Sequence, residues 1–303
     1  MTIEKQLQSA ESKLRASSSP RLDAEVLLAY VLRINRSSLL AHSDCEISIC
    51  HFFIRPDKKM TYNEVILSLL SWTKFWWLIH RRRMGIPVAY LAHKKEFYGR
   101  EFYVNKNVLI PRPETEILIQ ESIRLIRANQ ELNHVADVGT GSGCIAITLA
   151  YELPHINIIA TEISKAALKV AQKNAQQHGT ADRVTFLRGN LLEPVLAQQS
   201  SLANTLLIAN LPYILPNEYM GDIAHEPRGA LVGGKDGLKF YQELAEQVSR
   251  LSASDRPKTI LLELHPPTVE GATALVRELL PNYVSSIQFD LSQKPRVLSL
   301  VRT

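Results

Sequence analysis

Short apolar runs alternate with amphipathic stretches along the second half of the chain. Each run has the length of a strand that is buried on both faces, and the stretches between them repeat apolar residues at helical spacing. The expected strands are 134–138, 156–161, 184–187, 205–209 and 259–264, and the expected helices are 144–151, 165–178, 238–251 and 269–280. This alternation predicts a doubly wound α/β sheet. Two last runs, 284–289 and 297–301, have no helix between them and predict a closing antiparallel pair.

The first 90 residues have a different pattern. Apolar residues such as Leu7, Leu14 and Leu27 recur at helical spacing, and Ser19-Pro20 is a typical helix start. We therefore expect a small helical bundle, with no assignment for residues 45–63. Four neighbouring aromatic residues are expected to pack against the bundle or the next domain rather than to stack on nucleic-acid bases: Trp72, Phe75, Trp76 and Trp77.

A change of pattern after residue 90 indicates where the domains meet. Short alternating runs around Gly99 predict a hairpin, and a proline-rich turn then leads into a helix with Pro113 near its start. We expect a helical domain at 1–90, a hairpin linker at 91–112 and a catalytic domain at 113–303.

A glycine-rich motif follows the first expected strand of the sheet. Its glycines allow a sharp turn and a close approach to a ligand, and the helix behind it directs free N–H groups to the same place. By itself this motif indicates only a nucleotide-like ligand. The residues expected to bind a cofactor here are Gly139, Thr140, Gly141, Ser142 and Gly143.

Polar residues also follow the second and third expected strands. Glu162 can accept both hydroxyls of an adenosine ribose. Asn190 could read the edge of an adenine, with Leu191 on its face. Because the carboxyl ends of parallel strands meet at one edge of a sheet, these residues form one candidate cofactor site.

The fourth strand ends in Asn210-Leu211-Pro212-Tyr213. An ordinary strand-to-loop turn would also use Asn and Pro. However, the Asn210 side-chain oxygen and the Leu211 carbonyl can each accept one N–H of a flat amide, and the Tyr213 ring can cover its plane. A dinucleotide dehydrogenase has no use for this motif, and the spacing here is G-x-G-x-G. S-adenosylmethionine fits better, with the four residues in the catalytic role and Asn210 also near the cofactor.

Composition and charge limit the cellular compartments and binding partners that we expect. The 303 residues are 46% hydrophobic and 21% charged, and the three cysteines have no metal-ligand spacing, so neither a disulfide framework nor a metal site is expected. The longest apolar run is broken by Lys74, and no signal or transit peptide is recognised. We expect a cytoplasmic protein. Nine basic and two acidic residues lie in 74–112, a segment that could meet an acidic protein surface or RNA.

Five segments together resemble the bacterial release factor glutamine methyltransferases. The likeness covers nearly the whole chain apart from roughly residues 45–75. It is carried by Gly85-Ile-Pro-Val-Ala-Tyr-Leu91, Glu96-Phe-Tyr-Gly-Arg-Glu-Phe102, Val108-Leu-Ile-Pro-Arg-Pro-Glu-Thr-Glu116, Asp137-Val-Gly-Thr-Gly-Ser-Gly143 and Glu226-Pro-Arg-Gly-Ala-Leu-Val-Gly-Gly-Lys-Asp-Gly237.

The resemblance implies a fold and a reaction. The fold is a Rossmann-like, seven-stranded class I S-adenosylmethionine-dependent methyltransferase domain with a small helical N-terminal domain. The reaction is methylation of the amide nitrogen, N5, of the glutamine in the Gly-Gly-Gln loop of class I peptide chain release factors. The helical domain would help to hold the factor. A monomer is expected, with no membrane partner and no nucleic-acid substrate.

Three positions depart from the family pattern. Leu211 stands where the family motif has proline, Glu162 where it usually has aspartate, and 263–267 lacks the usual glycine and glutamine. Asn-Leu-Pro-Tyr is also the form of the motif in rRNA adenine dimethyltransferases. Two alternatives therefore stay open: a methyltransferase acting on the adenine amino group of RNA or DNA, and a non-catalytic homologue that binds the factor.

Overall fold

The computed structural model describes residues 2–45, 62–198 and 201–303. The chain divides into two compact units, Met1–His93 and Lys94–Thr303. The hairpin after residue 93 belongs to the second unit. Within the described ranges, no helix combines the length and the apolar character that crossing a membrane would need. Most of the stretch 45–63, which the sequence left unassigned, lies outside the described residues.

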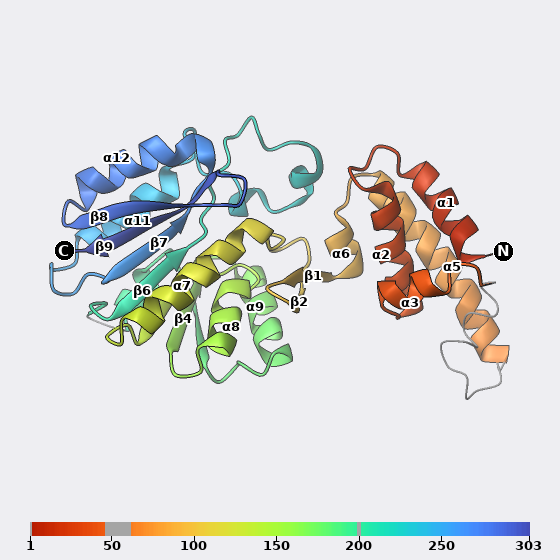
Figure 1. Cartoon of the computed structure of the whole chain (residues 1–303), viewed down its shortest axis with the longest axis horizontal. Coiled ribbons are helices and arrows are strands. Elements are labelled where there is room, and N and C mark those ends of the chain that lie inside the picture. Colours follow the sequence, from red (N-terminus) through yellow and green to blue (C-terminus); the bar gives the residue numbers. More distant parts are fainter. Residues whose placement is uncertain (1, 46–61, 199–200) are drawn as a thin grey trace. The chain divides into compact units, whose positions relative to one another are not determined.

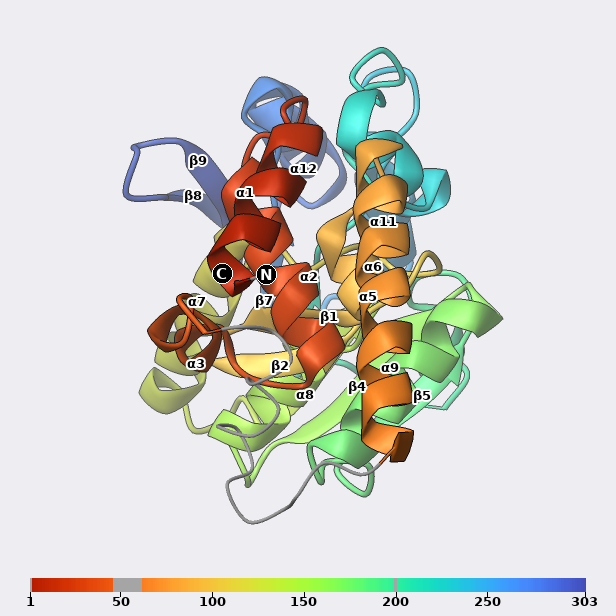
Figure 2. The same ribbon diagram turned by 90° about the vertical axis from the view of Figure 1, so that its right-hand side faces the viewer.

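The first unit is a bundle of helices, as the spacing of its apolar residues predicts (Figures 1 and 2). Leu7, Leu27 and Phe75 are fully buried in its core. Pro20 occupies the first position of the second helix, directly after Ser19, which confirms the predicted start. The helices are α1 (Ile3–Lys13), α2 (Pro20–Leu32), α3 (Arg36–Ala41), α5 (Tyr62–Arg83) and α6 (Val88–Ala92).

The aromatic cluster on α5 packs largely as expected. Trp72 and Trp76 contact the buried Phe75, with ring centroids 5.9 and 5.3 Å apart. Trp77 is the exception, because it is 54% exposed, with the Arg81 guanidinium 5.3 Å from its ring centroid. Position along the helix explains the difference, because Trp77 lies on another face from Phe75.

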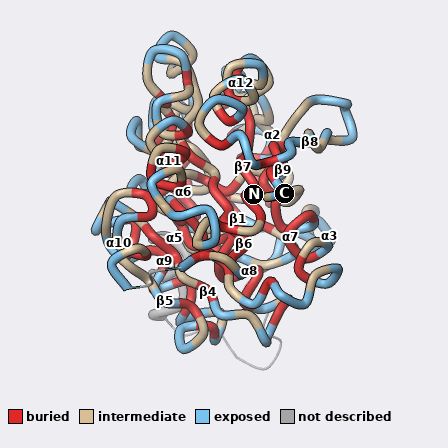
Figure 3. Tube along the Cα trace, turned by 90° about the vertical axis from the view of Figure 1, so that its left-hand side faces the viewer, coloured by how far each residue is buried: buried red, intermediate tan, exposed pale blue. Residues whose placement is uncertain are grey.

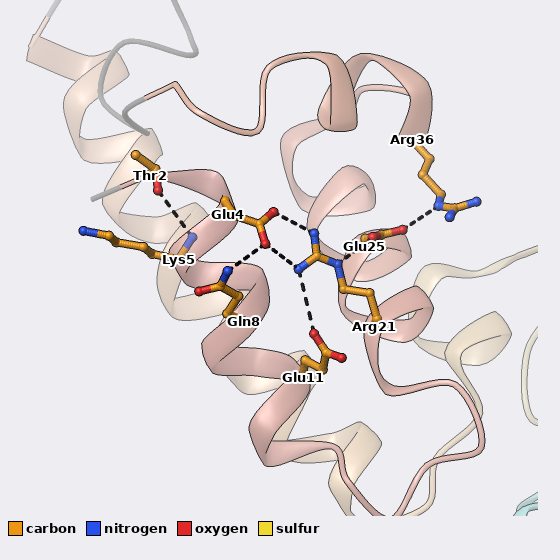
Figure 4. A network of polar contacts seen from close by, with 8 residues as sticks. All are labelled: Thr2, Glu4, Lys5, Gln8, Glu11, Arg21, Glu25 and Arg36. Carbon is orange, nitrogen blue, oxygen red and sulfur yellow. Dashed lines mark hydrogen bonds and ion pairs between the residues drawn. The ribbon is translucent and has the colours of Figure 1, made fainter.

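A network of ion pairs around Arg21 and Glu25 joins the first three helices of the bundle (Figure 4). Its guanidinium lies 2.7 Å from carboxylate oxygens of both Glu4 on α1 and Glu25 on α2, and Glu25 also accepts from Arg36 on α3 at 2.7 Å. The hydrogen bond from Arg21 lowers the pKa of Glu4. A single guanidinium with several donors can thus bridge two helices.

The second unit contains a seven-stranded sheet in the order β5-β4-β3-β6-β7-β9-β8 (Figure 1). The first five of these strands are parallel, and β9 runs antiparallel between β7 and β8. The predicted closing antiparallel pair is therefore confirmed. The strands are β3 (His134–Val138), β4 (Asn157–Glu162), β5 (Val184–Arg188), β6 (Thr205–Ala209), β7 (Thr259–Glu263), β8 (Tyr283–Phe289) and β9 (Pro295–Arg302).

Helices cover both faces of this sheet and create two cores. Leu206 and Ile208 of β6 point into the core under α7 and α8, whereas Leu207 points into the core under α11 and α12. Figure 3 shows this buried centre in red. The helices are α7 (Glu116–Ala128), α8 (Cys144–Glu152), α9 (Lys165–Gln177), α10 (Glu193–Leu196), α11 (Lys239–Ser249) and α12 (Val269–Leu279).

Short elements complete the second unit. A two-stranded hairpin, β1 (Lys94–Phe97) and β2 (Arg100–Tyr103), turns at Tyr98 and Gly99, both with positive φ. The 3-10 turns are η1 (Pro113–Thr115), η2 (Gly221–His225), η3 (Arg228–Ala230) and η4 (Pro266–Thr268). Since β6 lies between β3 and β7, the loops after these three strands meet at one edge of the sheet.

Candidate active site

The glycine-rich loop after β3 has the backbone that only glycine adopts easily. Gly139, Gly141 and Gly143 have φ values of 77°, 57° and 82°. A Cβ at Gly143 would lie 2.9 Å from Ile147 Cδ1 and 3.1 Å from Ala171 Cβ, so this glycine is needed for the packing of the loop onto α8 and α9. At Gly141 the nearest atom would be 3.9 Å away, which leaves space on that side of the loop.

The side chains of this loop point into the protein. Thr140 donates its hydroxyl to Oδ2 of Asp137 at 2.6 Å, and Oδ2 also accepts from the Ala146 N–H at 3.2 Å. Burial raises the pKa of Asp137 to about 6. Ser142 is buried, and its carbonyl accepts from the Asn174 amide at 2.8 Å. A ligand at this loop would therefore meet its backbone rather than the two hydroxyls.

Glu162, at the end of β4, is brought directly against the loop. Its Oε2 accepts from the Gly141 N–H at 3.0 Å and its Oε1 from the Ser164 N–H at 2.8 Å. Burial raises the pKa of this carboxyl, and the two backbone N–H groups oppose the effect. The two residues that the sequence assigned to one site, Gly141 and Glu162, are thus hydrogen-bonded neighbours.

Asn190 and Leu191 lie beyond the end of β5. The Asn190 amide is half-buried and approaches Oε1 of Glu193 at 3.4 Å, a long hydrogen bond. Leu191 is buried, with φ of 48°, a conformation that residues with a Cβ rarely adopt.

The motif after β6 contacts the glycine loop and the turn before α7. Leu211 is 3% exposed, and its Cδ2 lies 3.2 Å from the position that a Cβ at Gly139 would take. The Asn210 side-chain nitrogen donates to the Thr115 hydroxyl at 3.2 Å. With the amide assigned in this direction, Oδ1 is directed away from Thr115.

Tyr213 is held by two residues from the end of β7. Its hydroxyl donates to Oε1 of Glu263 at 3.0 Å, and its ring stacks on His265 with centroids 5.6 Å apart and planes inclined by 10°. His265 in turn lies 3.2 Å from a Glu218 oxygen. Burial raises the pKa of Tyr213, and the Glu263 carboxyl adds to this effect. The Tyr213 ring is therefore fixed in position.

Glu263 is a buried carboxyl at the centre of this arrangement, with 1% exposure. Burial raises its pKa to about 7, against the opposing effect of the Thr115 and Tyr213 hydroxyls. Among the residues that the structure describes, its Oε2 has no hydrogen-bond partner. The described hydrogen bond to this carboxyl is therefore the one from the Tyr213 hydroxyl to Oε1.

A pocket of about 170 Å³ opens beside the motif. Its wall includes Arg112, which forms an ion pair with the buried Glu226, and Oε2 of Glu226 also accepts from the Ile110 N–H at 3.0 Å. The guanidinium charge is therefore balanced within the wall. The lining is otherwise mostly apolar and consists of Leu109, Arg112, Asn210, Leu211, Pro212, Tyr213, Ile214, Ile223, Ala230 and Leu231.

Comparison with known proteins identifies the family. Residues 115–226 match the methyltransferase small domain, and residues 5–50 match the PrmC N-terminal domain. The chain is 32% identical to the release factor glutamine methyltransferase of Bacillus anthracis over 98% of both chains. It is 38% identical to that of Moorella thermoacetica, over 80% of this chain and 79% of the relative. The chain belongs to the release factor glutamine methyltransferase family.

Solved structures support the fold of this methyltransferase. The N-terminal domain of human METTL16 aligns with a TM-score of 0.52 at 19% identity, over 74% of this chain and 81% of that chain. At such low identity the likeness concerns the fold alone. The expected Rossmann-like, seven-stranded methyltransferase domain is confirmed.

Several residues around the candidate site were not assigned a role from the sequence. A Cβ at Gly233 would lie 2.3 Å from the Pro212 carbonyl oxygen, and one at Gly237 would lie 2.5 Å from that of Tyr213. These glycines let the loop after η3 lie directly on the motif, where the Ile214 N–H donates to the Leu231 carbonyl oxygen at 2.8 Å. The cluster of glycines in 233–237 was the available signal.

Thr115 and Glu263 were also not assigned a role. Thr115 lies in the turn that carries the family resemblance, but nothing in the turn itself points to Asn210, 95 positions away. Glu263 could have been found, because a carboxyl at the end of a fully buried strand needs an explanation.

Proposed function

We propose that this methyltransferase transfers a methyl group from S-adenosylmethionine to the N5 amide nitrogen of the glutamine in the Gly-Gly-Gln motif of class I peptide chain release factors. The observation that carries the proposal is the orientation of Asn210, whose nitrogen donates to Thr115 at 3.2 Å. Its oxygen is then available to accept an N–H from a substrate amide. The release factor glutamine methyltransferase names of the relatives support this substrate.

The chain's residues fit the cofactor. The space at Gly141 admits a ligand against the backbone, where a side chain would stand at any other residue. The Glu162 carboxylate accepts two hydrogen bonds from backbone N–H groups, and its remaining lone pairs can accept from ribose hydroxyls. The proposed cofactor residues are Gly139, Thr140, Gly141, Ser142, Gly143, Glu162, Asn190, Leu191 and Asn210. When bound, S-adenosylmethionine supplies an electrophilic methyl group on a positively charged sulfur.

The residues of the 210–213 motif would prepare the substrate nitrogen. An amide nitrogen is a poor nucleophile because its lone pair is delocalised into the carbonyl. Oδ1 of Asn210 and the carbonyl of Leu211 would accept its two N–H groups, which fixes the direction of the lone pair. Pro212 stiffens the turn, and the Tyr213 face opposite His265 would lie against the amide plane.

The wall of the pocket suits a neutral group. Arg112 is paired with Glu226, and most other lining side chains are apolar. A glutamine side chain carries no charge and brings a short apolar stem with a planar amide. Binding in a low-dielectric pocket strengthens the hydrogen bonds that hold this amide. No dedicated base is needed, because methylation itself acidifies the nitrogen.

The alternative of a nucleic-acid substrate has less support. Of the nine basic residues in 74–112, six have partners within the protein, including Arg82 with Asp23 and Arg100 with Glu152, both at 2.7 Å. Phosphate binding needs basic side chains that are free to contact the backbone of the nucleic acid. The six are Lys74, Arg81, Arg82, Lys94, Arg100 and Arg112.

The remaining parts of the proposal concern organisation. A helical domain at 1–90 helps to hold the factor, residues 91–112 link it to the catalytic domain at 113–303, and the protein acts as a monomer in the cytoplasm. Exposed Trp77 and Arg81 support a protein-binding role for the helical part.

Transfer of a labelled methyl group tests the proposal. Purified protein and labelled S-adenosylmethionine are mixed with a class I release factor, with the same factor in which the Gly-Gly-Gln glutamine is alanine, or with ribosomal RNA. Label on the intact factor alone is expected. Label on RNA would replace the proposal with the adenine alternative, and cofactor binding without any transfer would leave a non-catalytic homologue.

A further inference from the structure

We propose that His265 is a positioning residue, which stacks behind the Tyr213 ring and fixes the plane of that ring against the substrate amide. The inference rests on the proposed function, because it concerns the tyrosine of that same site. It goes further because 263–267 departs from the family pattern, so the resemblance assigns His265 no role.

The two rings are stacked. The His265 imidazole lies with its centroid 5.6 Å from that of the Tyr213 ring, and the two planes are inclined by only 10°. Rings in an offset-stacked arrangement at this distance attract each other. Tyr213 is part of the pocket lining, whereas His265 is not among the described residues that line it. We therefore place His265 on one face of the Tyr213 ring and the substrate amide on the other.

The hydroxyl of Tyr213 cannot fix the ring plane by itself. It donates to Oε1 of Glu263 at 3.0 Å. This oxygen lies on the axis that runs from Cβ through the ring, so the ring can turn about that axis without breaking the hydrogen bond. A flat amide is held by stacking only if the plane of the ring is fixed. The contact with the His265 imidazole supplies this restraint.

The imidazole is itself held by the loop that follows the motif. Its Nε2 lies 3.2 Å from Oε1 of Glu218, and Oε2 of Glu218 accepts from the Leu215 N–H at 3.0 Å. Leu215 follows Tyr213 by two positions, so this link joins the loop after β6 to the loop after β7. Both side chains are partly exposed, and such pairs contribute little to stability. The main effect of Glu218 is therefore to set the direction of the imidazole.

The backbone also keeps the two rings together. The His265 carbonyl accepts from both the N–H and the hydroxyl of Thr268, at 2.8 and 2.9 Å. A Cβ at Gly237 would lie 2.5 Å from the Tyr213 carbonyl oxygen and 2.9 Å from Thr268 Cγ2, so the backbone at Gly237 lies against both residues. The packing of the turn η4 thus fixes where His265 and Tyr213 stand relative to each other.

Two substitutions of His265 test the proposal on release factor methylation. His265→Ala removes the stacked ring and should lower kcat about 3- to 10-fold, the factor that corresponds to one aromatic pair. The KM for the factor should stay within about two-fold, because Tyr213 would contact a single side chain of a large substrate. His265→Phe keeps a flat ring without the contact to Glu218 and should keep kcat within about two-fold. Unchanged kcat in His265→Ala, or equal losses in both variants, would overturn the proposal.

His178→Ala is the matched control. The half-buried His178 also packs on an aromatic ring, that of Phe102, with centroids 4.8 Å apart, but it belongs to the contact between α9 and the β1–β2 hairpin. Its kcat should equal that of the unchanged protein. Glu218→Ala should lower kcat only about two- to three-fold, because the stack remains. A larger loss in Glu218→Ala than in His265→Ala would show that the stack is not what positions Tyr213.

A measurement without catalysis separates this inference from the proposed function. The ten tyrosines are replaced by 3-fluorotyrosine, and the fluorine-19 NMR signal of Tyr213 is assigned by its loss in Tyr213→Phe. Exposure of the second ring face in His265→Ala should shift this signal between H₂O and D₂O more than in the unchanged protein, in His265→Phe or in His178→Ala. If the shift appears but the unchanged protein fails to methylate the factor, only the function is wrong. An unaltered Tyr213 signal in His265→Ala would reject the positioning role.

Discussion

The side chain of Leu211 packs directly on Gly139, with Cδ2 3.2 Å from the place that a Cβ at Gly139 would occupy. The two residues belong to loops after β6 and β3, adjacent strands that pair Val138 with Ala209 at their ends. The proposed substrate motif and the glycine loop therefore share a packed contact. Leucine fills this contact where the family pattern has proline, and it keeps the carbonyl that the proposed mechanism uses.

Leu211→Pro is expected to preserve activity and to reduce stability. The backbone carbonyl remains, so kcat should stay within a few-fold of the unchanged value or rise. The smaller ring leaves space beside Gly139, which should lower the free energy of unfolding by about 1–2 kcal/mol. Initial rates and urea unfolding measure the two effects.

Leu211→Ala is the control for this substitution, because it leaves a similar space without restricting φ. It should lose comparable stability. A drop of kcat by more than about 100-fold in Leu211→Pro but not in Leu211→Ala would mean that the turn has another geometry than the family's.

Asn210→Ala is expected to lower kcat by about 10²–10³, the usual cost of removing one positioned polar contact to a transition state. The fold should be retained, because Asn210 is only half-buried. Asn157→Ala, an exposed asparagine at the opposite end of β4, is the matched control. Turnover by Asn210→Ala within a few-fold of the control would remove Asn210 from the mechanism.

Glu162→Ala is expected to weaken S-adenosylmethionine binding by about 10-fold or more, since hydrogen bonds to a charged group contribute about 1.5–3 kcal/mol. The variant also removes the carboxylate that accepts a hydrogen bond from the Gly141 N–H at 3.0 Å, so the glycine-rich loop is held less firmly. Calorimetry gives the dissociation constant, and Glu270→Ala, an exposed carboxyl on α12, serves as control. An unchanged constant would contradict the ribose assignment.

The sequence predicted the parts of the site that depend on strand order and missed those that depend on packing. The alternation of apolar runs and the glycine-rich motif placed Gly141 and Glu162 at the ends of neighbouring strands. In the structure the Gly141 N–H donates to the Glu162 carboxylate. Thr115 comes from a distant turn, and only the three-dimensional fold brings it to Asn210. Local patterns carry no information about such long-range contacts.

The residues at and after the end of β7 also make contacts that the sequence could not predict. Since 263–267 departs from the family pattern, no role could be carried over to it from the resemblance. In the fold, Glu263 bonds to the Tyr213 hydroxyl and His265 stacks on its ring. These two contacts to Tyr213 join residues about 50 positions apart in the sequence, so local patterns could not reveal them.

Glu226→Ala is expected to impair use of the release factor more than binding of the cofactor. Glu226 is buried and holds both Arg112 and the Ile110 N–H, so its loss leaves a donor and a charge unpaired in the pocket wall. The value of kcat/KM for the factor should fall at least about 10-fold, with the cofactor dissociation constant nearly unchanged.

Glu218→Ala is the comparison for this prediction, because Glu218 pairs with His265 outside the pocket lining. It should have the smaller effect on kcat/KM. Equal losses of cofactor and factor binding in Glu226→Ala would indicate a general loss of structure and would contradict a specific role in the wall.

Glu263→Gln is expected to change how the free energy of unfolding depends on pH. Burial raises the pKa of Glu263 from 4.5 to about 7, so between these values the folded protein keeps a proton that the unfolded chain has released. The stabilising contribution is complete below about pH 4.5 and is lost as pH rises through about 7. The difference corresponds to an upper limit of about 3 kcal/mol.

Asp137 acts in the same direction at lower pH, since burial raises its pKa from 3.8 to about 6. The free energy of unfolding, measured in urea from pH 5 to 8, should therefore fall with rising pH. Glu263→Gln cannot release this proton, so its decline should be shallower by about 1–3 kcal/mol over that range. The exposed substitution Glu270→Gln should follow the unchanged protein. If the free energy of unfolding of Glu263→Gln followed the same pH dependence as those of the unchanged protein and Glu270→Gln, Glu263 would have to be ionised throughout this range. Burial of the Glu263 carboxyl makes that costly, so this outcome would contradict the prediction.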